Sequence, residues 1–208
     1  FKTFLKNVKR KNNGYSLTIK NANDNVEKVS CDWVINCGGL NSDVISNYII
    51  KVNHSPKIYF SKGSYFKLSN KWRNHFNHLI YPLPDLKNNT LGIHLSFDKD
   101  GVTKLGPNAE EIAKSKENYN VDNNSIESFF IEASKYIKNL NIEDLSPDYA
   151  GIRPKIKNKN NHLSDFYIKE EIDNDFPKWI NLIGIESPGL TSCLSIAKYV
   201  LSIIKRYN

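Results

Sequence analysis

Three side chains that stand far apart in the sequence have the chemistry to move a proton and to hold an acid. His94 carries an imidazole, which titrates near neutrality and can take a proton at physiological pH. Arg153 offers a planar guanidinium that binds a carboxylate through two hydrogen bonds, which a lysine cannot do. Tyr65 offers a phenolic hydroxyl. Each also has a purely structural explanation, as a surface or hydrogen-bonded sheet histidine, a core aromatic, or a surface cation in the run Lys155, Lys157 and Lys159.

The elements that carry these side chains read as an antiparallel sheet covered on one side. Residues 58–60, 64–68 and 90–97 have a polar and an apolar face, which is typical of such strands. In the last of them Leu91, Ile93, Leu95 and Phe97 share one face, so His94 is expected to point to the other. A helix follows, with Asn124 and Glu127 as a predicted capping box and an apolar stripe of Ile126, Phe129, Phe130, Ala133 and Ile137.

The two ends of the chain each contain a strand, a glycine loop and a helix. Residues 29–36 become apolar on both faces in their second half, run into Cys37-Gly38-Gly39-Leu40 and continue as a short helix. Residues 179–185 are likewise apolar, break at 186–189, and precede a helix with apolar positions Leu190, Leu194, Ala197, Leu201 and Ile204 on one face. Such a loop brings backbone N–H groups and the positive end of a helix dipole to one point, which suits an anionic group or a cofactor edge. It can equally be structural.

These patterns predict a mixed α/β protein in which an antiparallel-sheet domain is inserted into an α/β domain. The α/β domain opens with a hairpin, since residues 11–14 (KNNG) form a turn signal before an alternating strand. The predicted boundaries are 1–55 and 149–208 for the first domain and 56–148 for the inserted one.

Composition narrows the class of protein further. With 208 residues, 39% hydrophobic and 25% charged, the chain can build a packed core, and global disorder is excluded. Three cysteines without a C-x-x-C pair argue against a disulfide framework or a zinc site and favour a reducing compartment. There is no signal peptide and no apolar run long enough to span a bilayer.

The net charge of +7 leaves several partners open, among them nucleic acid, a membrane surface and an anionic small molecule. A coding bias toward Lys, Asn and Ile would also produce it. No Asp or Glu occurs between Asp43 and Asp85, a stretch that holds six Lys or Arg residues. A basic nucleic-acid-binding module is therefore an alternative, but no recognised motif supports it and no nucleic acid is expected.

Seven segments in order resemble one family. VINCGGLNSD (34–43) resembles a segment of the FAD-dependent oxidoreductases related to D-amino-acid oxidase. KGSYF (62–66), LIYPLP (79–84), LGIHL (91–95), GPNA (106–109), AGIRP (150–154) and SPGLTS (187–192) resemble segments of L-2-hydroxyglutarate dehydrogenase and its bacterial oxidase relatives. The resemblance covers nearly the whole chain. The family's opening strand, G-x-G-x-x-G loop and helix have no match here, so the resemblance implies the later part of a Rossmann-like FAD-binding domain with an inserted substrate domain.

The resemblance implies FAD as the cofactor and two loops that approach it. The first loop supplies Asn36, Gly38, Gly39 and Leu40, where a side chain on either glycine would block the backbone. The second loop precedes the last helix, whose N-terminus in this superfamily points at the flavin and stabilises its reduced, anionic form. It supplies Ser187, Pro188, Gly189, Leu190 and Thr191.

The resemblance also implies oxidation of a 2-hydroxy acid such as L-2-hydroxyglutarate, by hydride transfer to FAD. His94 would be the base, Arg153 the carboxylate clamp and Tyr65 a hydroxyl donor. Lys62 and Ser64 replace an arginine and an acidic residue of the family, which leaves the substrate open, and an amine or amino-acid oxidase of the same superfamily is the alternative.

The natural electron acceptor stays open among a quinone, a carrier protein and oxygen. The chain alone is expected to be an inactive fragment that holds FAD weakly. It is expected in the cytoplasm or peripherally at the inner membrane.

Overall fold

The chain divides into two compact units. The computed structural model describes residues 2–49, 56–83, 92–157 and 163–207. Unit 1 comprises Phe1–Tyr59 with Pro154–Asn208, and unit 2 comprises Phe60–Arg153. The predicted domain limits remain a prediction. Pro84 and Leu91, which belong to two of the family-like segments, lie outside the described residues, as do residues 50–55 of the stretch without Asp or Glu.

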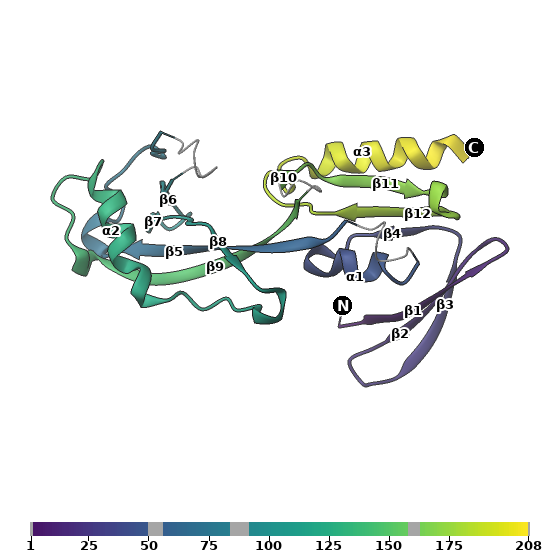
Figure 1. Ribbon diagram of the computed structural model, residues 1–208. Helices are drawn as coiled ribbons and strands as arrows, with labels where there is room; N and C mark the ends of the chain where they lie inside the picture. Colours follow the sequence, from purple (N-terminus) through teal and green to yellow (C-terminus); the bar gives the residue numbers. More distant parts are fainter. Residues whose placement is uncertain (1, 50–55, 84–91, 158–162, 208) are drawn as a thin grey trace. The chain divides into compact units, whose positions relative to one another are not determined.

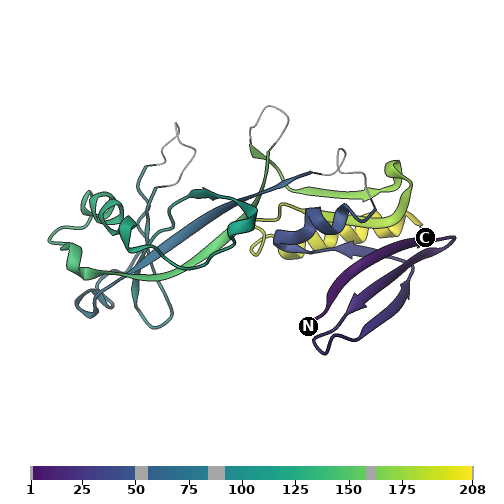
Figure 2. The same cartoon turned by 60° about the horizontal axis from the view of Figure 1, so that its bottom comes forward.

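Unit 1 opens with the predicted hairpin. Strands β1 (Phe4–Lys11), β2 (Gly14–Lys20) and β3 (Val26–Cys31) form one antiparallel sheet (Figure 2). Gly14 ends the turn with φ of +101°, and a Cβ there would lie 2.2 Å from the Cys31 carbonyl oxygen, so only glycine fits. Tyr15 is buried edge-on against Trp179 at 5.3 Å between ring centroids, which packs this sheet onto the next.

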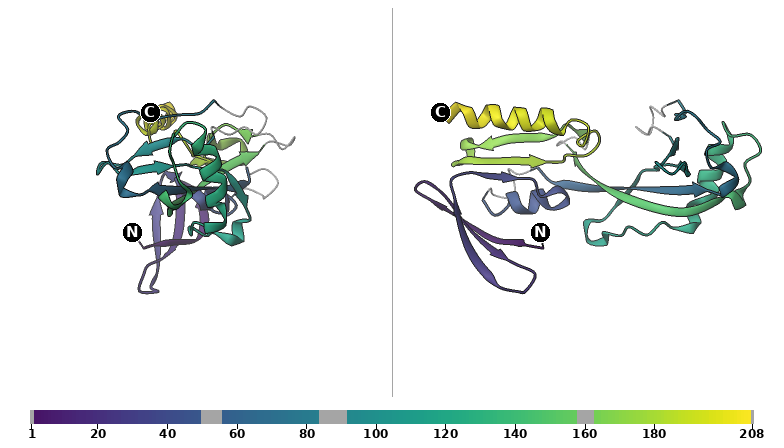
Figure 3. Two further views of the ribbon diagram at one scale, coloured as in Figure 1. Left: turned by 90° about the vertical axis from the view of Figure 1, so that its left-hand side faces the viewer. Right: turned by 180° about the vertical axis from the view of Figure 1, so that it is seen from behind.

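The second sheet of unit 1 contains both strand, glycine and helix units that the sequence predicts. Its order is β11 (Tyr167–Glu171), β12 (Phe176–Ile183) and β4 (Val34–Asn36), with β12 and β4 parallel. Helix α1 (Ser42–Ser46) follows β4, and helix α3 (Cys193–Ile204) follows β12 and lies along the sheet (Figures 1 and 3). The mixed α/β prediction is confirmed.

The apolar stripe predicted for α3 is not the side of the helix that the structure buries. Val200 and Ile203 are the buried residues of this helix, whereas Leu190 before it is 90% exposed and Leu194 is 76% exposed. The helix is apolar on two sides, so periodicity alone does not decide which side meets the sheet. Ile35 of β4 belongs to the segment that is apolar on both faces, yet it is 43% exposed and lines the same apolar hollow as the open side of α3.

A network of buried amides joins the elements of unit 1. The Asn181 side chain, fully buried on β12, accepts hydrogen bonds from the Asn36 amide (2.8 Å) and the Trp179 indole (3.0 Å). It donates to Ser46 Oγ (2.9 Å) on α1 and to the Glu171 carboxylate (2.7 Å) on β11. Because every polar atom of this amide is paired, the network fixes one arrangement of the strands and α1.

Substituting Asn181→Ala is expected to destabilise the protein by about 3 kcal/mol or more, since it leaves several buried partners without a hydrogen bond. Urea unfolding measures the free energy. The exposed Asn23→Ala serves as the control and is expected to change stability by less than about 0.5 kcal/mol. Equal stability of the two variants would show that the network contributes nothing.

Unit 2 is built on a third, mainly antiparallel sheet. The strand order is β10 (Leu163–Ser164), β9 (Leu145–Lys157), β5 (Ile58–Leu68), β7 (Thr103–Leu105) and β6 (Leu95–Phe97), and β8 (Glu110–Ile112) also pairs with β5. The outer parts of β5 and β9, and all of β10, belong to unit 1. The short 3₁₀ helices of the chain are Gly39–Asn41, Asn70–Trp72, Lys114–Lys116, Asn123–Ser125, Ile142–Asp144, Ile172–Asn174 and Lys205–Tyr207.

Alternation along β5 gives this sheet one core face and one open face. Phe66 and Leu68 are buried, and Phe66 packs at 4.6 Å between ring centroids against Phe129 of helix α2 (Ile126–Ser134). Tyr65 and Lys67 point to the opposite face. The covered side and the open side therefore match the prediction of an antiparallel sheet that is packed on one side only.

Three details of the prediction for unit 2 differ from the structure. Asn124 and Glu127 form no capping box, because the Asp122 carboxylate accepts the Asn124 N–H (2.9 Å) one turn earlier and a 3₁₀ turn precedes α2. Ile137 is buried but lies beyond the end of α2. Residues 90 and 91 of the strand predicted at 90–97 lie outside the described residues, and within 92–97 only Leu95–Phe97 is a regular strand, in which Phe97 is 38% exposed.

The Asp144 carboxylate holds the segment before β9. It pairs with Lys71 (2.8 Å) and accepts from Ser69 Oγ (2.9 Å) and the Asn141 N–H (3.0 Å). Burial alone would raise the pKa of Asp144, but these partners outweigh it and lower the pKa from 3.8 to about 2.

The ionised Asp144 is therefore expected to stabilise the fold above about pH 4, and this stabilisation, about 2 kcal/mol, is lost as the pH falls through about 2. Asp144→Asn is expected to remove that part of the pH dependence and to lower stability at pH 7. Unfolding in urea at pH 7, 4, 3 and 2 measures both effects. Asp100→Asn in an exposed loop is the control. An Asp144→Asn curve parallel to that of the unchanged protein would contradict the assignment.

Candidate active site

The open face of the unit 2 sheet carries two aromatic stacks in one row. Tyr65 stacks on Tyr149 of β9, with ring centroids 4.5 Å apart and planes 13° from parallel. His94, just before β6, stacks on Tyr81 at 4.5 Å and 22°. Gly106 lies between the two stacks: its N–H donates to the His94 carbonyl (2.9 Å), and a Cβ on it would meet Tyr65 Cδ1 at 2.9 Å. The fold therefore brings His94 and Tyr65, predicted as site residues, to one row.

His94 has the properties of a proton acceptor. Its ring is half-buried, and its Nδ1 atom is buried without a hydrogen-bond partner in the described part of the chain. Burial lowers the pKa of His94, the positive charge of Arg153 lowers it further, and a backbone contact with Gly92 acts in the opposite direction. The imidazole is thus neutral at physiological pH and can accept a proton.

Arg153 lies close enough to influence both His94 and Tyr65 through its charge. Within the described residues no carboxylate pairs with its guanidinium, although it is half-buried at the end of the open face. Burial raises the pKa of Tyr65, the neighbouring Tyr149 adds to this, and Arg153 opposes it. Tyr65 therefore keeps its proton near neutrality and can donate a hydrogen bond, while the Arg153 guanidinium stays available for an anion.

Sequence reasoning missed two residues of this face, Tyr149 and Lys104. The Lys104 ammonium lies 5.1 Å from the centre of the Tyr149 ring and is neutralised by Asp148 (2.6 Å) and Asp98 (3.5 Å). Alternation along β9 puts Tyr149 on the same face as Arg153, so the period of the strand was the signal that could have found it.

The two departures from the family pattern point away from this row. Lys62 and Ser64 are buried on the core side of β5, where the Lys62 ammonium donates to the Asn120 carbonyl and the Ser64 N–H donates to the Asn108 amide (2.8 Å). Their side chains therefore lie on the opposite face of β5 from Tyr65.

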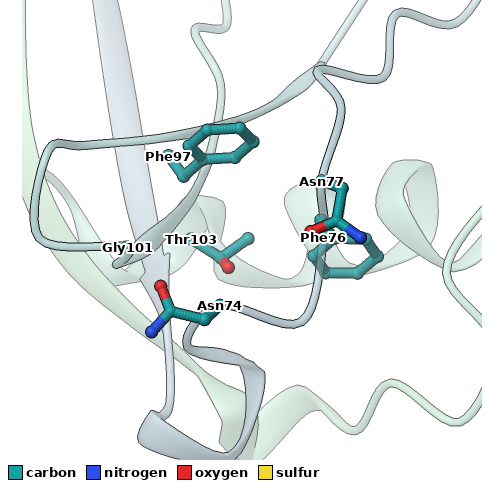
Figure 4. A pocket seen from close by; sticks show the side chains of 6 residues that line it. All are labelled: Asn74, Phe76, Asn77, Phe97, Gly101 and Thr103. Atoms are coloured by element: carbon teal, nitrogen blue, oxygen red, sulfur yellow. The ribbon is translucent and has the colours of Figure 1, made fainter.

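A separate pocket of about 260 Å³ also lies in unit 2 (Figure 4). Its wall includes Thr103, which alternates with Lys104 along β7, so it opens on the other side of that strand from the aromatic row. Thr103 Oγ1 is already bound to the Trp72 carbonyl (2.9 Å). The lining residues are Asn74, Phe76, Asn77, Phe97, Gly101 and Thr103.

The first predicted cofactor loop lies in unit 1, at the end of β4. The Asn36 side chain is committed to this chain, since it donates to the Ser42 carbonyl (2.7 Å) and accepts from the Gly38 N–H (3.1 Å). Gly38 has a packing reason, because a Cβ would lie 2.5 Å from Ile45 Cδ1. Gly39 has a φ of +55°, and a Cβ added to it would meet no atom within 4 Å. Leu40 beside it is half-buried. Gly39 thus leaves the backbone open to a cofactor.

The second predicted loop leads into α3. Gly189 is buried, and a Cβ there would lie 2.5 Å from Ile185 Cγ2, whereas Ser187, Pro188, Leu190 and Thr191 are exposed. Gly39 and Gly189 line one hollow of about 570 Å³. The hollow is otherwise lined by Ile35, Cys37, Leu182, Ile185, Cys193, Ile196, Ala197, Val200, Leu201 and Ile204. The open backbone at Gly39 and the exposed loop leave backbone groups accessible to a cofactor, whereas the other residues that line the hollow are apolar or cysteine and offer no charged group to the FAD pyrophosphate.

A family model described as FAD dependent oxidoreductase matches residues 4–203. The chain belongs to this family. An L-2-hydroxyglutarate dehydrogenase, mitochondrial, of Arabidopsis thaliana is 36% identical over 177 residues, which are 80% of this chain and 36% of the relative. A glycerol 3-phosphate dehydrogenase of Caloramator mitchellensis is 28% identical over 199 residues, 95% of this chain and 38% of the relative.

Two solved structures share the fold. The FAD-bound, dithionite-reduced L-alpha-glycerophosphate oxidase of Mycoplasma pneumoniae has a TM-score of 0.77 at 20% identity, over 98% of this chain and 50% of that one. Glycine oxidase of Geobacillus kaustophilus has a TM-score of 0.71 at 12% identity, over 98% and 48%. The chain thus spans between about a third and a half of the proteins it matches. In its described part, no helix has the length and apolarity to cross a membrane.

The geometry around His94 predicts its titration. The pKa of His94 is expected to lie below the ordinary 6.5 and to rise in Arg153→Gln, which removes a positive charge, and in Tyr81→Ala, which lets water reach the ring. NMR titration of the imidazole protons measures each pKa. Lys99→Gln, an exposed cation of the same unit, is the control and is expected to leave the His94 pKa unchanged. An unchanged pKa in both test variants would remove the stated causes.

Proposed function

We propose that this chain carries the substrate face and part of the cofactor site of a flavin-dependent enzyme that oxidises a 2-hydroxy acid, such as L-2-hydroxyglutarate, to the 2-oxo acid. The observation that carries the proposal is the presence, on one face of unit 2, of a His94 imidazole whose buried Nδ1 has no hydrogen-bond partner in the described residues and of an Arg153 guanidinium that has no carboxylate partner there. A 2-hydroxy acid offers a carboxylate to the guanidinium and a hydroxyl proton to the imidazole.

Each residue of the row has one task in this reaction. The Arg153 guanidinium binds the substrate carboxylate through two hydrogen bonds, and the Tyr65 hydroxyl donates a third hydrogen bond to the bound acid. His94 removes the proton of the substrate hydroxyl as the C–H bond breaks and the C=O bond forms. FAD, when bound, accepts the hydride that leaves the carbon.

The relatives support the cofactor and the reaction type. Glycerol-3-phosphate dehydrogenase of Bacillus halodurans, a structure with FAD, shares the fold with a TM-score of 0.71 over 99% of this chain. Gly38, Gly39 and Leu40 of the first loop and residues 187–191 of the second are proposed to hold FAD in this chain. Asn36 is proposed to act there through the Gly38 backbone that it fixes, since its own side chain is fully bonded within the chain.

Glycerol 3-phosphate is the second candidate substrate. The Caloramator mitchellensis relative that covers 95% of this chain carries that name, and a guanidinium binds a phosphate through the same bidentate geometry as a carboxylate. The identity to the Arabidopsis thaliana dehydrogenase is higher, 36% against 28%, which favours the 2-hydroxy acid. The electron acceptor remains open among a quinone, a carrier protein and oxygen.

The test measures turnover by the gene product that contains these residues, supplied with FAD and an artificial electron acceptor. L-2-hydroxyglutarate is expected to be oxidised in preference to glycerol 3-phosphate and to a panel of amino acids. His94→Gln is expected to lower kcat by about 10² to 10⁴-fold, because the general base is lost. Arg153→Lys is expected to raise KM by about tenfold or more, because the bidentate contact is lost.

Matched controls are His78→Gln and Arg73→Lys, which change exposed residues of the same types in unit 2. Both are expected to retain activity. Turnover of glycerol 3-phosphate alone would establish the second candidate, turnover of amino acids alone would establish the amine oxidase alternative, and an inert response to every 2-hydroxy acid would reject the proposal.

A further inference from the structure

The two nitrogens of the His94 ring differ in their access to solvent. The ring as a whole is half-buried, and its Nδ1 atom is buried without a hydrogen-bond partner in the described part of the chain. Because Nδ1 is buried, a substrate hydroxyl can deliver a proton to the ring only at Nε2. A neutral imidazole carries one proton, on one nitrogen or the other. For Nε2 to accept a proton, the resting ring must therefore hold its own proton on Nδ1.

The backbone of Gly92 favours that position of the proton. Its contact with the His94 ring raises the pKa of the imidazole, which is the direction expected where a carbonyl oxygen faces a ring N–H. Gly92 has a φ of +70°, and a Cβ on it would lie 2.8 Å from Pro82 Cγ. Only glycine therefore lets the chain turn under Pro82 and bring this carbonyl to the ring.

The backbone at His94 is held on both sides. Leu95 and Ile80 exchange two hydrogen bonds, from the Leu95 N–H to the Ile80 carbonyl (2.9 Å) and from the Ile80 N–H to the Leu95 carbonyl (3.1 Å). On the side of β7, the His94 carbonyl accepts the Gly106 N–H (2.9 Å). The position of the His94 Cα is thus fixed by two neighbouring segments, and only rotation of the side chain is left to be restricted.

Tyr81 restricts that rotation. In an antiparallel pair, the residues next to a hydrogen-bonded pair stand opposite each other with their side chains close together. The bonded pair of Ile80 and Leu95 therefore places Tyr81 opposite His94, and the two rings stack with centroids 4.5 Å apart and planes 22° from parallel. Tyr81 is 56% exposed, so packing in the core does not account for an aromatic side chain at this position.

The groups around the ring favour a neutral imidazole. Arg153 of β9 lowers the pKa of His94 through its charge, and no carboxylate acts on the ring from the described residues. Tyr65 of β5 lies within reach of the charge of Arg153 and of the Tyr81 phenol, and its raised pKa keeps it protonated. The ring therefore rests with a single proton near neutral pH.

We propose that Nε2 of His94 takes the substrate proton, and that Tyr81 is a positioning residue that holds the ring with a protonated Nδ1 turned toward the Gly92 carbonyl. This inference rests on the proposed function and adds the accepting atom and the residue that orients it. The proton of the substrate hydroxyl passes to Nε2 as the electron pair of the C–H bond leaves as hydride to the flavin. The ring then carries a proton on each nitrogen, and Nε2 later releases its proton to solvent.

The position of the proton is measured by NMR in the gene product that contains these residues, with ¹⁵N-labelled histidine and without substrate. The His94 signals are assigned by their loss in His94→Gln. Above the pKa of His94, the unchanged protein is expected to carry the proton on Nδ1. Tyr81→Phe keeps the stacked ring and is expected to keep this tautomer. Tyr81→Ala is expected to give a mixture of both tautomers, because the ring turns and water reaches Nδ1.

The consequence for the reaction is measured by turnover of L-2-hydroxyglutarate across a range of pH. Tyr81→Ala is expected to lower kcat by about 10- to 100-fold and to change KM less than about threefold, because the base is misplaced while the carboxylate contact stays. The low-pH limb of kcat/KM is expected to move to higher pH, since the pKa of His94 rises once water reaches the ring. Tyr81→Phe is expected to restore both properties.

Tyr119→Ala is the matched control, because Tyr119 is a tyrosine of unit 2 that is 49% exposed and has its hydroxyl bonded to Glu117 (2.8 Å). It is expected to change neither the tautomer nor kcat.

A proton on Nε2 in the unchanged protein would overturn the inference while the proposed function stands. The same holds if Tyr81→Ala keeps both the tautomer and the kcat of the unchanged protein. Failure of the unchanged protein to oxidise any 2-hydroxy acid would reject the proposed function, and the catalytic role of Nε2 with it. The tautomer is read without substrate, so the two failures are distinguishable.

Discussion

The hydrogen bond between the Asn36 and Asn181 side chains lies where the parallel strands β4 and β12 pair, and the rest of unit 1 is arranged around it. The two asparagines face each other in the ladder, and each holds a second element: Asn36 holds the loop to α1, and Asn181 holds α1 and β11. Buried amides tolerate few alternative geometries, because an unpaired one costs more than a lost apolar contact. The loops at Gly39 and Gly189 therefore start from fixed points.

Unit 2 separates stability from chemistry by the two faces of one sheet. The inward residues of β5, β6 and β7 pack with α2 into a core that includes Phe66, Leu95, Leu105 and Phe129. The outward residues, among them His94, Tyr65 and Arg153, contribute little to that core. The two-residue period of a strand is what makes this division possible, since neighbouring residues serve different tasks. Lys62 and Ser64 show the same rule, because they sit beside Tyr65 in sequence and on the other side of the sheet.

Much of the fold could be predicted from local patterns, and the site could be predicted only in part. Strand alternation and the turn at Gly14 are local properties, so the hairpin and the two strand, glycine and helix units were found. The buried side of α3 was not, because that helix is apolar on two sides and the choice depends on which side its sheet meets. Family resemblance pointed to His94, Arg153 and Tyr65. It did not point to Tyr149, although the period of β9 puts Tyr149 on the face of Arg153. The stacking of Tyr149 on Tyr65 depends on the register between β9 and β5, a property that no single segment encodes.

The stacking of Tyr65 on Tyr149 and of Tyr81 on His94 affects the entropic cost of binding a ligand at these rings. A ring held between a neighbour and the sheet has lost much of its rotational freedom before any ligand arrives. Ordering a free side chain upon binding carries an entropic cost of about 0.5–1.5 kcal/mol for each group immobilised. Here folding has met most of that cost, so the polar atoms at the ring edges are already aimed when the ligand enters. In the proposed reaction, the row would therefore act as a preformed template, and its selectivity would come from a shape fixed by folding.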